Sequence, residues 1–167
     1  LTTGKTTDEV NEKLVDDYMN DKSKTKIILA STNNEVNSIN DMIKERLKEE
    51  RIKNNQQVHK EVKILIELNG NEYERSFAKE DEIIFTKNMK VDKSLKLLNG
   101  ERGKIVNIHN KNLTFEIERI DDNQKIVKTQ HTINTDDFNC FNHSYACTTH
   151  KSQGKTVDSC FVKAGAL

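Results

Sequence analysis

Hydrophobic positions in the first part of the chain recur at helical spacing and then at strand spacing. Residues 8–20 carry apolar side chains every three or four positions, which predicts a helix. The continuous apolar run 26–30 predicts a strand buried on both faces, as in a parallel sheet. Polar residues at 31–34 can end this strand and cap a long helix, whose apolar stripe runs from residue 36 to residue 47. A strand, a polar turn and a helix in this order form one α/β unit.

The pattern changes after about residue 55 to short alternating segments separated by turn residues. The dipeptide Asn69-Gly70 is a hairpin signal between two predicted strands, 62–68 and 71–77. Further strands are predicted over residues 82–86, 104–108, 113–120 and 125–133. Many short strands at this spacing predict a small antiparallel barrel or sandwich.

Near residue 138 the pattern returns to a polar turn, a short helix and a strand. Ser144 is a candidate cap for that helix, and Gly154 is a candidate left-handed residue at its end. The apolar run Cys160-Phe161-Val162 predicts a buried strand. The predicted fold class is therefore α/β over residues 1–55 and 138–167, with a β-module inserted at residues 56–137.

The inserted segment contains both candidate core residues and candidate surface residues. Tyr73, Phe77 and Phe115 fall in strand patterns, so we expect them in the core rather than on a stacking surface. The segment from Lys87 to Lys104 is locally basic. Such charges more often form a solvated face, and the alternative is a surface that guides single-stranded DNA.

Composition limits the classes of function. The 167 residues allow one domain, or a small domain with an insertion. Lys and Arg together number 27, as do Asp and Glu together, so nucleic-acid binding would depend on the local placement of charge.

No apolar run approaches the roughly 18–20 residues of a membrane span, which predicts no membrane partner and a cytoplasmic location. Cys140, Cys147 and Cys160 lack the spacing of zinc ligands, and we expect neither zinc nor disulfides.

The richest candidate chemistry lies between Tyr145 and Gly154, in the run Tyr-Ala-Cys-Thr-Thr-His-Lys-Ser-Gln-Gly. Thr149, His150 and Lys151 can donate hydrogen bonds to phosphates. A polar segment next to a buried strand is where open α/β sheets place ligand chemistry. The alternatives are a solvated surface helix that ends at the glycine and, for the histidine, a structural role.

A second candidate site follows the first predicted strand. Thr32 and Asn33 lie at the carboxyl end of that strand, where the next helix starts. Their hydroxyl and amide groups, together with free helix N–H groups, can bind DNA phosphates. Plain helix capping is the alternative, and one side chain can serve both purposes.

These motifs resemble those of a known family. The core of the run from residue 145 to 154 resembles motif V of superfamily 1B DNA helicases, the RecD-like group. Its longer form, which ends at Asp158, looks like the helicase half of TraA-type conjugative relaxases. Residues 27–40 resemble motif IV, and residues 77–88 and 98–106 resemble the stretch that leads into the inserted SH3-like module of this family.

The resemblance implies part of a RecA-like fold, namely domain 2A of a P-loop NTPase helicase, interrupted by an SH3-like antiparallel β-barrel and truncated before motif VI. It implies DNA binding by Thr32, Asn33, Thr149, His150 and Lys151. It also implies positions at the nucleotide cleft for Gln153, Gly154 and Thr156. Two residues depart from the pattern of some relatives: Ser31 replaces an arginine that touches nucleotide, and Thr156 replaces a glutamate that contacts ribose.

The resemblance further implies an ATP-dependent DNA helicase and relaxase of bacterial conjugation. The intact protein would use ATP and Mg²⁺, and its expected partners are single-stranded DNA, its own first RecA-like domain and relaxosome proteins. Gly4-Lys5-Thr6 lacks the first glycine of a phosphate loop, and neither a Walker B carboxylate nor motif VI is visible. We therefore expect this fragment to bind no nucleotide alone and to be inactive by itself.

Other functions fit the same sequence. The departures at Ser31 and Thr156 allow a degenerate helicase domain that acts as a non-catalytic adaptor for a partner protein. A RecD-like repair helicase outside conjugation is a further alternative. A phosphate loop upstream and motif VI downstream would favour the motor, and a relaxase domain upstream would favour conjugation over repair.

Overall fold

The chain forms two compact units in the computed structural model, which describes residues 7–148 and 157–163. The first unit combines Leu1–Val58 with Ser144–Leu167, and the second unit is the intervening segment His59–His143. The second unit is thus inserted into the first along the sequence. It ends at His143, beyond residue 137, where the sequence pattern placed the end of the β-module.

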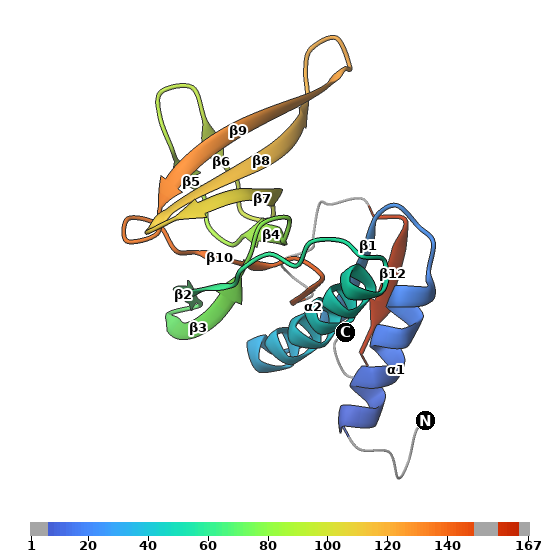
Figure 1. Cartoon of the computed structure of the whole chain (residues 1–167). Coiled ribbons are helices and arrows are strands. Elements are labelled where there is room, and N and C mark those ends of the chain that lie inside the picture. The colour runs from blue at the N-terminus through green and yellow to red at the C-terminus, as the bar shows by residue number, and fades with distance from the viewer. Residues whose placement is uncertain (1–6, 149–156, 164–167) are drawn as a thin grey trace. The chain divides into compact units, whose positions relative to one another are not determined.

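The first unit is a parallel α/β layer. Its elements are α1 (Thr7–Asn20), β1 (Lys26–Ala30), α2 (Asn33–Lys53), β11 (Ala146–Thr148) and β12 (Ser159–Val162). The three strands pair in the order β11-β1-β12, and both pairings are parallel. Figure 1 shows the helices α1 and α2 beside β1 and β12. The helices and the strand predicted over the first 47 residues are confirmed.

The helices cover one face of this sheet. Ile28 and Ala30 of β1 point to that face and pack with Val15 of α1 and with Val36 and Ile39 of α2. This burial of an amphipathic stripe against alternate strand positions is the main stabilisation of the layer.

The prediction of a buried strand at Cys160–Val162 is half right. The strand is present as β12, but Cys160 and Val162 are exposed. Phe161 between them points to the helices and lies edge-on to Tyr18, with ring centroids 6.4 Å apart. Successive strand residues point to opposite faces, so only one face of β12 is covered by α1.

The prediction that Ser144 caps a helix is wrong. Ser144 is buried, and the next residues form the strand β11, which pairs with β1 from Ala146 to Thr148. Polar residues in this segment suggested a helix end. Pairing with an already buried central strand decides otherwise, because it satisfies the backbone groups of β11 inside the protein. The remainder of the predicted helix, including Gly154, lies outside the described residues.

The second unit is antiparallel. A five-stranded sheet has the order β10-β4-β7-β8-β9, and two hairpins, β2-β3 and β5-β6, accompany it. The strands of the unit are β2 (Val62–Leu68), β3 (Asn71–Phe77), β4 (Glu82–Phe85), β5 (Met89–Lys90), β6 (Lys96–Leu97), β7 (Arg102–His109), β8 (Asn112–Ile120), β9 (Ile126–Asn134) and β10 (Phe141–His143). Figure 1 shows β8 and β9 as a long twisted hairpin. Among the described residues the pairings run in a line from β10 to β9, so the sheet is open where the sequence predicted a barrel or sandwich.

Two details of this unit test the turn and strand predictions. Asn69 and Gly70 have φ angles of 54° and 83°, the left-handed pair that a tight hairpin between β2 and β3 requires. β10 replaces part of the predicted polar turn before Ser144, and it pairs antiparallel with β4, with Phe141 opposite Phe85 and His143 opposite Ile83.

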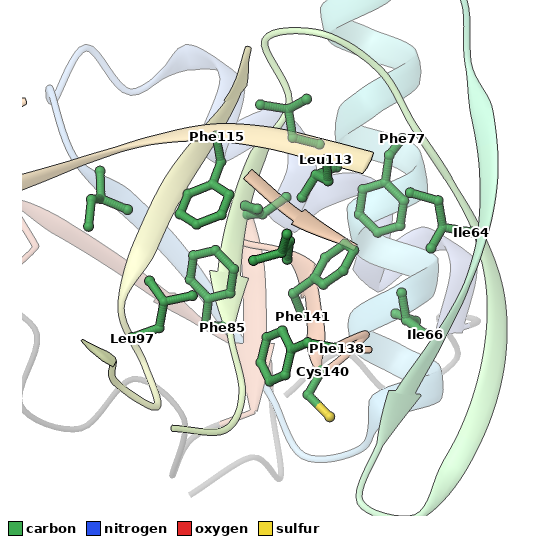
Figure 2. Close-up of a cluster of buried hydrophobic side chains, with 14 of the residues drawn as sticks. Ile64, Ile66, Phe77, Phe85, Leu97, Leu113, Phe115, Phe138, Cys140 and Phe141 are labelled. Carbon is green, nitrogen blue, oxygen red and sulfur yellow. The ribbon is translucent and has the colours of Figure 1, made fainter. Parts of the chain in front are cut away.

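The core of the second unit combines Phe side chains with Ile and Leu side chains, as Figure 2 shows. Phe77, Phe85, Phe115 and Phe141 are fully buried, and the Phe85 and Phe115 rings lie 4.9 Å apart between centroids. The predicted core positions of Phe77 and Phe115 are confirmed, and Tyr73 packs against this core while partly exposed.

The β8–β9 hairpin offers a matched test of this core. Ile117 is 1% exposed and Ile126, on the paired strand, is 65% exposed. We expect Ile117→Ala to lower the free energy of unfolding by about 2–5 kcal/mol, because it leaves a cavity in a packed core. Ile126→Ala should change it by less than about 0.5 kcal/mol. Urea unfolding followed by far-ultraviolet circular dichroism measures both, and equal effects would contradict the observed burial.

Candidate functional site

Polar side chains lie at the carboxyl ends of all three parallel strands. Ser31 and Thr32 follow β1, Lys163 follows β12, and Thr148 is the last residue of β11. Because parallel strands end at the same edge, these residues gather at one side of the sheet, where α2 begins. This is the edge at which open α/β sheets bind ligands.

Thr32 caps α2. Its backbone is extended, with φ −122° and ψ 155°, and its hydroxyl oxygen accepts a hydrogen bond from the Glu35 backbone N–H at 3.2 Å. The capping interpretation of Thr32 is thus confirmed, while phosphate binding by the exposed Thr32 side chain stays a prediction. Asn33, the other predicted residue here, is the first residue of α2 and is half-buried.

Glu35 is the electrostatic centre of this edge. The hydroxyls of Ser31 and Thr32 donate to Glu35 Oε1 at 2.8 and 3.1 Å, and Lys163 Nζ lies 2.7 Å from Glu35 Oε2. The Lys163 hydrogen bond, followed by those from the two hydroxyls, lowers the pKa of Glu35 from 4.5 to about 2 against the opposing effect of burial. Its position in the first turn of α2 also favours the carboxylate, because the helix dipole is positive there.

Lys163 is a site residue that the sequence pattern did not reveal. Its backbone N–H donates to the Leu29 carbonyl at 2.9 Å, which extends the pairing of β1 with β12 by one residue. Side chains alternate along a strand, so Lys163 points to the same face as Phe161, toward α2. A lysine two residues after an inward-facing aromatic residue was the available signal. Its carboxylate partner is 128 positions away in the chain and could not be recognised from local pattern.

Asn40 is a second functional candidate that the sequence pattern did not reveal. It is fully buried on α2, in the apolar stripe of that helix. Its side-chain amide donates to the Ala146 carbonyl at 3.2 Å and accepts from the Ala146 N–H at 2.7 Å. Ile28 of β1 bonds the neighbouring Tyr145 carbonyl, so Ala146 turns its own polar groups away from β1. Asn40 satisfies both groups and holds β11, which lies in the first part of the motif V run.

Thr149, His150, Lys151, Gln153, Gly154 and Thr156 lie outside the described residues. The flanking residues are defined: Thr148 ends β11, and Asp158 precedes β12. The Asp158 carboxylate accepts from the Thr25 backbone N–H at 3.2 Å, at the amino end of β1 and therefore at the opposite edge from Glu35.

Within residues 7–148 and 157–163, no cluster of His, Cys, Asp and Glu side chains is suited to hold a metal ion. Neither helix of the described chain is both long enough and apolar enough to cross a membrane.

The described residues form an α/β layer with polar side chains at one edge, and an antiparallel β-unit interrupts this layer along the sequence. This chain is similar in sequence to a segment of the TraA conjugal transfer proteins, which confirms the TraA-type resemblance. It is 31% identical over 138 residues to a probable TraA of Sinorhizobium fredii, covering 83% of this chain. It is 32% identical over 152 residues to TraA of Rhizobium radiobacter and 31% identical over 152 residues to TraA of Agrobacterium fabrum, covering 90% of this chain in both.

The chain spans only 11–12% of the length of these relatives. No protein-family model matches it. Similar solved structures include Bacteroides Pif1 bound to single-stranded DNA, with a TM-score of 0.48, 17% identity, and coverage of 94% of this chain and 39% of that chain. Another is Bacteroides Pif1 helicase with ADP-AlF3 and single-stranded DNA, with a TM-score of 0.46, 16% identity, and coverage of 95% and 39%.

Glu35 should make the stability of the first unit depend on acid pH. Because its folded-state pKa lies below its ordinary value, its contribution is present above about pH 4.5 and is lost as the pH falls toward 2. We expect Glu35→Gln to lower the free energy of unfolding by about 1–3 kcal/mol at neutral pH and by progressively less at lower pH. Urea unfolding at a series of pH values measures this. Glu49→Gln, on an exposed position of α2, is the control and should keep the wild-type pH dependence.

The role of Asn40 has a local readout. Asn40→Ala leaves the buried N–H and C=O of Ala146 without their side-chain partner, which should cost about 2–4 kcal/mol of stability. Hydrogen exchange measured by NMR should show faster exchange of the Ala146 amide in particular. Asn34→Ala, at an exposed position of the same helix, serves as the control. Unchanged protection of Ala146 in Asn40→Ala would show that the amide pair is not needed to hold β11.

Proposed function

We propose that this chain is the second RecA-like domain of an ATP-dependent DNA helicase, within a TraA-type relaxase of conjugative transfer. The similarity to TraA proteins over 83–90% of the chain supports the conjugative context. The motif V run supports a helicase of the RecD-like superfamily 1B. On this proposal the second unit is the SH3-like insertion, although its sheet is open among the described residues.

The observation that carries the proposal is the polar edge of the parallel sheet. Ser31, Thr32 and Lys163 lie there with the amino end of α2, and Thr148, within the motif V run, is the last residue of β11 at the same edge. Hydroxyl, ammonium and helix N–H groups are the usual donors to DNA phosphates. In the proposed complex Thr32, Asn33, Thr149, His150 and Lys151 contact the backbone of single-stranded DNA.

The proposed share of this chain in the motor is mechanical. Gln153, Gly154 and Thr156 would face the nucleotide cleft, while the first RecA-like domain of the intact protein would hold ATP and Mg²⁺. Bound ATP would supply the free energy of closure between the two domains. In the closed state, both faces of the cleft would contact the nucleotide. The strength with which this chain binds DNA would then change each time the cleft closes and opens. We place this activity in the bacterial cytoplasm, with relaxosome proteins as further partners.

An adaptor function has one observation in its favour. Ile120 and Ile126 are paired across β8 and β9, and they are 66% and 65% exposed. Exposed cross-strand isoleucines favour contact with another protein over contact with DNA. On the adaptor hypothesis, the wild-type chain would show no affinity for single-stranded DNA even at low salt.

Motif V provides the test. We expect His150→Ala/Lys151→Ala to weaken binding of a fluorescent single-stranded oligothymidylate by about tenfold, because donors to the phosphates are lost. The dependence of log affinity on log salt should become shallower by about 0.7 for each lost phosphate contact, measured by anisotropy between about 50 and 200 mM salt. Lys48→Ala, an exposed lysine on α2, is the charge control. Equal affinity and salt dependence in the double variant and the wild type would remove motif V from the DNA site.

A further inference from the structure

Donors from separate segments converge on the carboxylate of Glu35. Ser31 and Thr32 donate from the turn after β1 at 2.8 and 3.1 Å, and Lys163 donates from the end of β12 at 2.7 Å. Hydroxyl and ammonium donors aimed at one anion, beside a helix amino terminus, also suit the oxygens of a phosphate. A carboxylate of the protein itself occupies this position in the structure.

The buried hydroxyl of Thr148 is an independent sign that a ligand belongs here. Thr148 pairs with Ala30, so its side chain points to the α2 face of the sheet, one strand away from the turn that contains Ser31. The residue is 4% exposed, and its oxygen has no hydrogen-bond partner in the described part of the chain. A buried hydroxyl without a partner is costly, and an added acceptor at this edge would satisfy it.

The buried ammonium group of Lys163 requires an anion beside it at all times. Its side chain is only 10% exposed, and a buried cation is strongly unfavourable without an anion beside it. Glu35 is more accessible, with 27% of its side chain exposed, so it can turn outward while Lys163 stays in place. A phosphate that arrives as Glu35 leaves would keep the lysine paired in both states.

We propose that Glu35 is a built-in competitor for a nucleic-acid phosphate site formed by Ser31, Thr32, Thr148 and Lys163. The inference rests on the proposed binding of single-stranded DNA and adds Lys163 to the contacts, with Glu35 as the residue that limits affinity. In the free protein Glu35 pairs with Lys163 and accepts from the hydroxyls. In the DNA complex a backbone phosphate takes these donors, and the carboxylate moves into solvent. The exchange keeps DNA binding weak enough to be released in each cycle of a motor.

Matched charge-neutralising variants of this chain test the exchange. Glu35→Gln should bind the fluorescent oligothymidylate about five- to tenfold more tightly than wild type, because the competing carboxylate is gone. Glu49→Gln removes the same charge from an exposed position of α2 and should change the affinity by less than about twofold. Adding Lys163→Met to Glu35→Gln should abolish the gain and make the salt dependence shallower by about 0.7. The double variant leaves no buried charge unpaired, and circular dichroism confirms its folding.

The outcomes separate this inference from the proposed function. If the wild type binds DNA but Glu35→Gln binds no more tightly, the carboxylate is only a structural partner of Lys163, and the inference is overturned. An equal gain in Glu49→Gln would assign the effect to overall charge and overturn it as well. If neither the wild type nor Glu35→Gln binds at low salt, the proposed DNA-binding function itself fails. Tighter binding by Glu35→Gln alone, lost on removal of Lys163, supports the exchange.

Discussion

The parallel pairing of β1 with β11 and β12 is the constraint on which the rest of the first unit depends. β1 lies near the start of the chain, while its partners lie near the end, on the far side of the inserted unit. Each pairing satisfies backbone groups that would otherwise be buried without partners. The same pairing sets the register, and the register decides which residues share a level of the sheet. Ala30 and Thr148 are brought to one level, and Lys163 follows the pair formed by Leu29 and Val162.

Register also decides which side chains meet α2. Ile28, Ala30 and Phe161 face the helices and form a continuous apolar layer with them. Beyond this layer the same face carries Lys163, so a cation is placed beneath the first turn of α2. Glu35, in the first turn of α2, forms an ion pair with this lysine, and the helix dipole favours a carboxylate there. The chemistry at this edge is therefore a consequence of the same alternation that builds the core.

Polar groups also hold the edge of the sheet. A strand with one unsatisfied side either recruits another strand or needs another partner for its N–H and C=O groups. Asn40 fills that role for Ala146, and it does so from within an otherwise apolar helix stripe. The buried amide costs stability unless both of its hydrogen bonds form, so it specifies one position of β11 against α2. The predicted DNA-binding residues of motif V begin with Thr149, three residues after Ala146 in the sequence.

The sequence alone determined the elements whose signal is local. Apolar spacing identified α1, β1 and α2, the dipeptide Asn69-Gly70 identified the turn between β2 and β3, and the motif V run pointed to TraA-type proteins. Whether the segment around β11 forms a strand or a helix depends instead on β1, a partner strand more than a hundred residues away. This is why the prediction at Ser144 failed. The Glu35–Lys163 pair and the two bonds of Asn40 were likewise decided only by the tertiary structure. Local periodicity specifies which face of an element is apolar, but it does not specify which distant residue that face will meet.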